Sequence, residues 1–222
     1  MVGLQSPALT GEHARYPSLR ALAAHYADLI LQMQPDGPHH LLGWSTGGIL
    51  AQEIACQLQA RHARVGVVCL LDAYPADAWR DRAPAEAHDV WRAILHIAGQ
   101  DPDVLAADGP LTRERVIGFL RAQKHPLGEL TDAQLHGIFE AVAASNTLVK
   151  AHPHQRYDGE LLYFRAALDH VGENLHPDMW APWAESLAVH DVPSLHAHMP
   201  GEAALAHWLP VLEEALADKE RG

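Results

Sequence analysis

The chain has 222 residues, enough for one domain with a small sub-domain inside it. Hydrophobic residues make up 48% of it and charged residues 20%, a balance that excludes an intrinsically disordered chain. The formal net charge is −12, and no basic block interrupts the acidic excess. An acidic chain of this kind is a poor polyanion binder, which argues against nucleic acids and anionic membrane surfaces as partners.

Three features favour a cytoplasmic protein. The longest strongly apolar run, residues 65–71, is too short to cross a bilayer. Residues 1–17 lack the charged-then-apolar layout of a signal peptide. The two cysteines, Cys56 and Cys69, stand in apolar surroundings, so we expect reduced core thiols and no disulfide.

Strands and helices alternate in the first third of the chain. A short apolar piece at 2–5 is a candidate strand, and Ser18 is the expected N-cap of the first helix. A strand over 39–44, a helix over 47–61 and a β-branched-rich strand over 65–71 follow. Strand, helix and strand in this order predict a right-handed βαβ unit and a parallel sheet.

Residues 76–151 carry helical patterns and no convincing strand. Within them, Thr131 and Gln134 stand at capping-box spacing ahead of an apolar helical face. A helical stretch of this length between two strands favours a lid, and ordinary packing helices are the alternative. Two further strands and a closing helix are expected at 160–164, at 186–192 and from Glu202 onward.

Residues 43–48, Gly-Trp-Ser-Thr-Gly-Gly, match the pattern Gly-x-Ser-x-Gly between an expected strand and an expected helix. On such a turn the serine takes a strained backbone that exposes its Oγ, and the helix N-terminus favours developing negative charge. Glycines are expected at 43 and 47, because side chains two residues from the serine would meet neighbouring backbone. Ser45 is the candidate nucleophile; a glycine-rich turn with an incidental serine is the alternative.

A serine nucleophile needs a base, and the base needs an orienting carboxylate. Asp72 ends the 65–71 strand, at the sheet edge where ligands collect, although it could also be a turn-forming aspartate. Asp169, after the 160–164 strand, is its rival. The base is expected between the last strand and the last helix, and three histidines stand near there: His190, His196 and His198.

Two pairs of histidines, His152 with His154 and His196 with His198, could each be half of a metal site. No third ligand at a known spacing accompanies either pair. We therefore expect no metal.

Four segments resemble the type I thioesterase domain that ends nonribosomal peptide synthetases and some polyketide synthases. They are Val2–Pro7, Gly37–Gly48, Leu70–Pro75 and Val189–Met199. The Gly-Trp-Ser-x-Gly-Gly elbow and the Leu-Leu-Asp-x-Tyr-Pro strand end are the most specific parts, and the helical stretch matches least. The resemblance implies an α/β-hydrolase fold, with a mostly parallel sheet and flanking helices over 1–75 and 152–222 and a helical lid over 76–151.

The resemblance also implies the roles of single residues. Ser45 would be the nucleophile, His196 the base, and Asp72, in preference to Asp169, the acid. The backbone N–H of Thr46 would be one oxyanion donor. The substrate would be an acyl or peptidyl thioester on the phosphopantetheine arm of a carrier protein, released by hydrolysis or cyclisation, with no cofactor of the enzyme's own.

One departure from the family pattern stands out. The family has a further strand and a His-Pro-x-Gly-Gly-like loop ahead of the Val2 segment, and that loop supplies a second oxyanion N–H. Neither occurs in this sequence, and loss of one such donor typically costs ~10²–10³ in rate. The alternatives are a discrete editing (type II-like) thioesterase, a small-ester hydrolase, or a truncated, non-catalytic remnant that only binds carrier protein.

Overall fold

The computed structural model describes residues 2–4, 16–83, 85–169 and 174–221. The chain divides into two compact units. The sheet unit comprises residues 17–81 and those from 149 onward, and the helical unit comprises 82–148 together with the described residues before 17. Each unit has its own buried apolar core.

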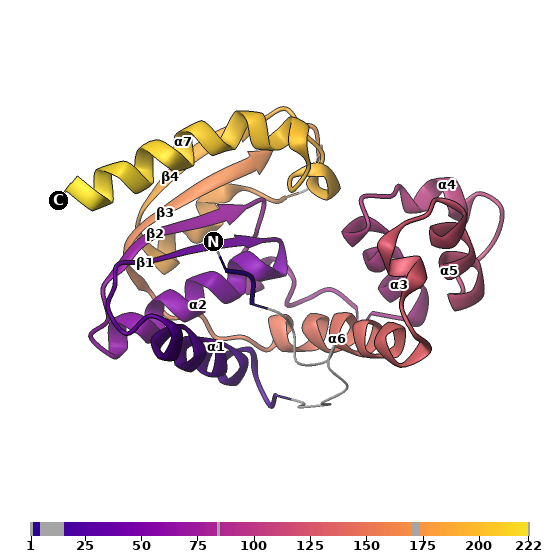
Figure 1. The fold of residues 1–222 in the computed structure, drawn as a ribbon, viewed down its shortest axis with the longest axis horizontal. Helices are drawn as coiled ribbons and strands as arrows, with labels where there is room; N and C mark the ends of the chain where they lie inside the picture. The colour runs from indigo at the N-terminus through magenta and orange to yellow at the C-terminus, as the bar shows by residue number, and fades with distance from the viewer. Residues whose placement is uncertain (1, 5–15, 84, 170–173, 222) are drawn as a thin grey trace. The chain divides into compact units, whose positions relative to one another are not determined.

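The sheet unit contains four parallel strands in the order β1-β2-β3-β4 (Figure 1). They are β1 (His39–Trp44), β2 (Val65–Leu71), β3 (Tyr157–Ala166) and β4 (Ala184–Val192). The predicted bounds of β1 and β2 are confirmed. β3 extends past both ends of the predicted 160–164 and β4 begins earlier than the predicted 186, because the added residues lack an apolar pattern. Residues 2–4 form no strand, contrary to expectation, and residue 5 lies outside the described residues.

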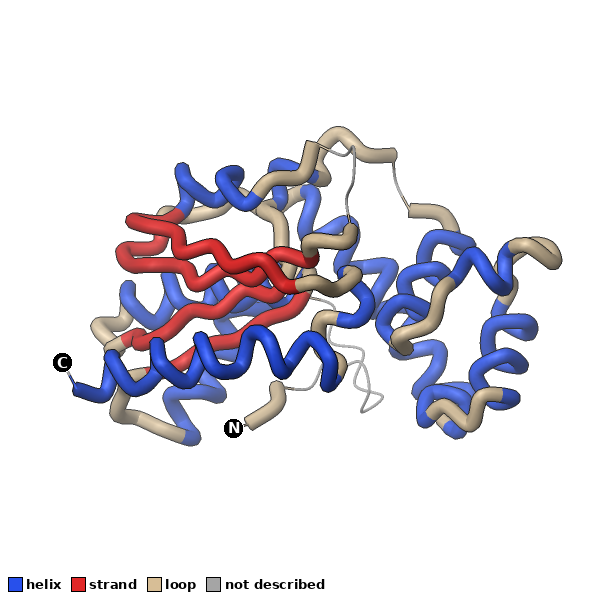
Figure 2. Tube along the Cα trace, turned by 90° about the horizontal axis from the view of Figure 1, so that it is seen from above, coloured by secondary structure: helices blue, strands red, loops and turns tan. Residues whose placement is uncertain are grey.

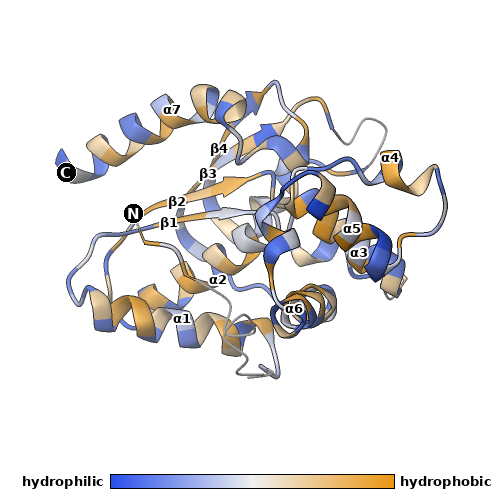
Figure 3. Cartoon of the chain, turned by 45° about the vertical axis from the view of Figure 1, so that its right-hand side comes forward, coloured by the Kyte–Doolittle hydropathy of each residue, from blue (hydrophilic) through white to orange (hydrophobic). Residues whose placement is uncertain are grey.

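Helices cover both faces of this sheet (Figures 1 and 2). α1 (Leu19–Met33) and α2 (Thr46–Ala60) lie on one face, and α7 (Glu202–Arg221) lies on the other. Figure 3 shows apolar and polar residues alternating along α7, as expected of a helix with one buried face. The predicted N-cap is confirmed, since the Ser18 hydroxyl accepts from Ala21 N at 3.1 Å.

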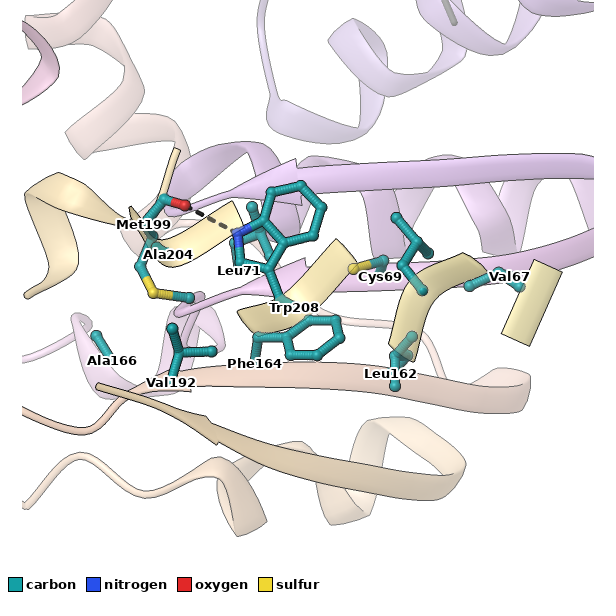
Figure 4. Close-up of a cluster of buried hydrophobic side chains, with 11 residues drawn as sticks. Val67, Cys69, Leu71, Leu162, Phe164, Ala166, Val192, Met199, Ala204 and Trp208 are labelled. Carbon is teal, nitrogen blue, oxygen red and sulfur yellow. Dashed lines mark hydrogen bonds between the residues drawn. The ribbon is translucent and has the colours of Figure 1, made fainter. Parts of the chain in front are cut away.

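The core under α7 joins the helix to the sheet (Figure 4). Its centre is Trp208, whose indole N–H donates to the Met199 carbonyl at 3.0 Å. This bond fixes the start of α7 against the chain that leaves β4. Cys69 lies in the same core, and Cys56 is also buried and unbridged. Burial raises the pKa of both thiols to about 12, so neither is a reactive thiolate.

The helical unit has no strand among its described residues. It contains α3 (Ala87–Ile97), α4 (Pro102–Ala106), α5 (Arg113–Ala122), the short η3 (Pro126–Glu129) and most of α6 (Asp132–Lys150). The predicted capping box is confirmed: Thr131 N donates to Gln134 Oε1, and Gln134 N donates to Thr131 Oγ1. The role of this unit as a lid stays a prediction.

Candidate active site

Ser45, Asp72 and His196 meet at the carboxyl ends of the parallel strands. Ser45 follows β1, Asp72 follows β2, and His196 begins a short 3-10 turn, η5 (His196–His198), after β4. His196 Nε2 lies 3.1 Å from Ser45 Oγ, and His196 Nδ1 lies 2.7 Å from Asp72 Oδ2. The hydroxyl, imidazole and carboxylate are therefore connected by two hydrogen bonds across residues distant in sequence.

Ser45 lies on a strained turn, with φ 56° and ψ −127°. A Cβ at position 43 would come within 2.1 Å of the Gly47 carbonyl oxygen, so the expectation of a steric glycine there is confirmed. The same expectation for position 47 is wrong, because a Cβ there would meet no atom within 4 Å. The second steric glycine is Gly48, where a Cβ would come within 2.3 Å of the Ala73 Cβ.

The first turn of α2 begins directly after the serine. Thr46 is the first residue of this helix, so its N–H has no acceptor within the helix. The Ser45 N–H donates to the Leu71 carbonyl at 3.1 Å, and the Ser45 carbonyl accepts from Gly48 N at 2.9 Å. These bonds hold the serine backbone between the end of β2 and the start of α2.

Asp72 is buried, with 1% of its surface exposed, and also has a positive φ of 45°. Its Oδ1 accepts from the Ala166 N–H at 3.1 Å and from the Tyr74 hydroxyl at 3.2 Å, which leaves Oδ2 for His196. An ionised carboxylate can only accept hydrogen bonds, so His196 Nδ1 donates to Asp72 Oδ2 and Nε2 is the nitrogen that accepts from the Ser45 hydroxyl. Burial and the Asp72 charge raise the pKa of Tyr74, which keeps its hydroxyl a donor.

The other candidate residues are not part of this chain of bonds. Asp169 Oδ2 accepts from the backbone N–H of His196 at 2.8 Å. His190 lies on β4 against the Phe164 ring, and His198 is exposed at the end of η5. The structure thus brings only His196 of the three histidines to Ser45.

Two contacts of His196 were not foreseen from the sequence. The Trp44 indole N–H donates to the His196 carbonyl at 3.0 Å, and the two rings lie 5.3 Å apart. The sequence offers Asp169 only as a catalytic acid, whereas the structure shows its carboxylate accepting from the His196 backbone N–H. The tryptophan next to the candidate nucleophile was the only sequence signal for the first contact.

His152 and His154, a candidate half of a metal site from their spacing in the sequence, lie in a buried polar cluster. His154 Nε2 accepts from Ala76 N at 2.9 Å, and its Nδ1 lies 3.2 Å from Gln52 Oε1. Both ring nitrogens of His154 are therefore occupied by protein groups. In the part of the chain that the structure describes, no three His, Cys, Asp or Glu side chains gather as a metal site.

The chain matches the family model described as Thioesterase domain over residues 1–207. It is 28% identical over 219 residues to a probable non-canonical nonribosomal peptide synthetase, CymA, of Salinispora arenicola, covering 96% of this chain and 3% of that protein. It is 31% identical over 183 residues to a dimodular nonribosomal peptide synthase of Bacillus subtilis, covering 82% of this chain and 8% of that protein. The chain thus spans a small part of these curated relatives.

Solved structures share the fold. A crystal structure of a holo four-domain nonribosomal peptide synthetase bound to AMP and glycine superimposes with a TM-score of 0.77 at 20% identity. The match covers 95% of this chain and 17% of that one. The solved NocB thioesterase domain superimposes with a TM-score of 0.67 at 21% identity, covering 96% of this chain and 81% of that one. At these identities the likeness shows the fold alone, and the predicted α/β-hydrolase architecture is confirmed. Separately, none of the described helices has the length and apolar character that crossing a bilayer requires.

Proposed function

This chain belongs to the thioesterase domain family, and we propose that it releases an acyl or peptidyl chain from the phosphopantetheine arm of a carrier protein. The observation that carries the proposal is the pair of hydrogen bonds that joins Ser45 Oγ, the His196 imidazole and the Asp72 carboxylate. The relatives named as nonribosomal peptide synthetases support the carrier-bound thioester as substrate. The enzyme uses no cofactor of its own.

In the first half-reaction, Ser45 Oγ attacks the thioester carbonyl while His196 Nε2 takes the hydroxyl proton. Asp72 keeps the imidazole in the required tautomer and stabilises the imidazolium that forms. The tetrahedral oxyanion accepts from the Thr46 N–H at the start of α2. The C–S bond then breaks, the proton passes from His196 to the departing thiolate, and the acyl group remains as an ester on Ser45.

In the second half-reaction, water or a nucleophile within the bound chain attacks that ester. His196 takes the proton of the attacking group and returns it to Ser45 Oγ as the C–O bond breaks. Water gives a free acid, and an internal nucleophile gives a ring. We assign the helical unit the role of a lid that limits access of water to this step, and the cytoplasm as the place of action.

The test is covalent labelling with a fluorophosphonate followed by peptide mass spectrometry. We expect the label on Ser45, and its loss in Ser45→Ala and His196→Ala. Ser186→Ala, which removes an exposed serine hydroxyl on β4, should label like the wild type. A chain that melts cooperatively yet takes no label would overturn the catalytic proposal.

A second measurement addresses the substrate. Release of an acyl group from a phosphopantetheinylated carrier protein should be faster than hydrolysis of the matching small ethyl ester, measured as kcat/KM. Equal or reversed values would favour a small-ester hydrolase. If Ser45 takes the label but no carrier thioester is released, the roles of Ser45, His196 and Asp72 are supported. The assignment of a carrier-bound substrate is then wrong.

A further inference from the structure

His196 is held by its backbone as well as by its ring. It begins a 3-10 turn of three residues, whose internal bonds are His198 N to the Leu195 carbonyl at 3.0 Å and Met199 N to the His196 carbonyl at 3.3 Å. Such a short turn does not by itself fix the position of its first residue. The N–H and the carbonyl of His196 each gain a partner from elsewhere in the sheet unit.

The partner of the N–H is Asp169, from the chain that leaves β3. This chain is itself bonded to the one that leaves β4: Ala167 N donates to the Val192 carbonyl at 2.9 Å, and Leu168 N donates to the Ser194 carbonyl at 3.2 Å. The pairing of β3 with β4 thereby continues past the ends of both strands. This pairing places the Asp169 carboxylate next to His196, with Oδ2 2.8 Å from the His196 backbone nitrogen.

The partner of the carbonyl is Trp44, the residue directly before Ser45. Its indole N–H donates to the His196 carbonyl at 3.0 Å, and its ring lies against the imidazole at an interplanar angle of 35°. One side chain thus connects the backbone next to the nucleophile with the backbone of the base. A change in the distance between Ser45 and His196 would strain this contact.

We propose that Asp169 and Trp44 are positioning residues, which hold the backbone of His196 from two sides so that Nε2 stays within reach of Ser45 Oγ. The inference rests on the proposed function. Asp169 acts here as a hydrogen-bond acceptor and not as the catalytic acid, a role that Asp72 fills. Misplacement of a catalytic group by about 1 Å can cost ~10² in rate, so the loss of either contact should be measurable.

The experiment compares variants by the rate of fluorophosphonate labelling of Ser45, with folding checked by a cooperative melt. Asp169→Ala removes the acceptor and should slow labelling by about 10- to 100-fold. Asp169→Asn keeps an acceptor oxygen and should restore labelling to within about threefold of the wild type. Asp191→Ala, which removes an exposed aspartate from β4, is the matched control and should label normally.

The tryptophan is tested in the same way. Trp44→Phe keeps an aromatic ring but loses the N–H, and we expect labelling to slow by about tenfold while the midpoint of its pH profile stays where the wild type has it. Trp183→Phe removes another indole donor, one bound to Asp77, and is the control. A merely structural role would lower the melting temperature without changing the labelling rate of the folded enzyme.

The outcomes separate this inference from the proposed function. If wild-type Ser45 takes no label, the proposed function fails and the positioning roles fail with it. If the wild type labels but Asp169→Ala and Trp44→Phe label equally fast, only the positioning roles are overturned. If Asp169→Asn is as slow as Asp169→Ala, the charge of Asp169 matters and its assignment as a simple acceptor is wrong.

Discussion

Two histidines of the sheet unit, His196 and His154, each have partners at both ring nitrogens, but those partners differ in their chemistry. His196 lies between a hydroxyl and a carboxylate, with 23% of its side chain exposed. His154 lies between a backbone N–H and an amide oxygen and is buried. The first set of partners can exchange a proton with the ring, and the second cannot.

The partners of His154 fix one neutral tautomer. Its Nε2 accepts from Ala76 N, so that nitrogen carries no proton. The Gln52 amide nitrogen donates to the Gln155 and Trp183 carbonyls, which leaves its oxygen to accept from His154 Nδ1–H. His154 therefore joins α2 to the segments around 76 and 155 as a structural residue. The comparison teaches that a histidine's role follows from the chemistry of its partners, since both rings are fully bonded.

Replacing either histidine by alanine should have the strongest consequence, and a different one at each position. His196→Ala should lower kcat for thioester hydrolysis by a factor on the order of 10⁶ while leaving the unfolding midpoint nearly unchanged. His154→Ala should do the reverse: it leaves Ala76 N without an acceptor in a buried site, at a cost of about 2–4 kcal/mol in the free energy of unfolding. Urea unfolding and steady-state kinetics on both variants check this, and a turnover defect in folded His154→Ala would contradict it.

The next effect concerns the two aspartates near His196. Asp72→Asn should lower kcat by about 10⁴-fold, because an amide that donates to Nδ1 would favour the wrong tautomer. Asp169→Asn should change kcat by far less, since the His196 N–H keeps an acceptor. Hydrolysis rates of the two variants, measured at saturating substrate, decide which aspartate is the acid. Equal losses, or a larger loss at Asp169, would reverse the assignment of the acid.

The sequence predicted those features of the fold and the site that depend on adjacent residues, and it missed contacts between distant segments. The bounds of β2 follow from a continuous apolar run, those of β1 from a short stretch with an apolar end, and Ser45 from a pattern of adjacent residues. The contact between Asp169 and the His196 N–H depends on how two loops pair beyond their strands, which no spacing in the sequence encodes. The structural use of His154 depends likewise on burial among distant segments.

The glycines on either side of Ser45 also show that a sequence pattern does not reveal contacts between distant atoms. The pattern gives glycine at 43 and 47, but steric need depends on what lies opposite each Cβ. Gly43→Ala should cost about 3 kcal/mol of stability, because the new methyl group meets the backbone of Gly47 and Gly48. Gly47→Ala should be neutral or stabilising by up to about 1 kcal/mol, since alanine favours the helix. Thermal or urea unfolding of the two variants measures this, and an equally large loss at position 47 would contradict the geometry.

His154 should also make the stability of the fold depend on pH. Burial, with the nearby charges of His152 and Arg80, lowers the pKa of His154 from 6.5 to about 3. The unfolded chain therefore binds one more proton than the folded chain at this residue between those values. The stabilisation is fully present above pH 6.5 and is lost as the pH falls through this window, with a slope that approaches about 1.4 kcal/mol per pH unit.

His154→Gln removes the titrating group while keeping an acceptor for Ala76 N, so its stability should fall less steeply between pH 6.5 and pH 4 than that of the wild type. His152, whose pKa burial lowers to about 4, is present in both proteins, so the difference between the two curves comes from the replacement of His154. His62→Asn is the control, because His62 is exposed and has a positive φ that asparagine tolerates.

Urea unfolding of the three proteins at several pH values gives the slopes. Parallel curves for His154→Gln and the wild type would mean that His154 can accept a proton in place, and the contrast with His196 would then no longer hold.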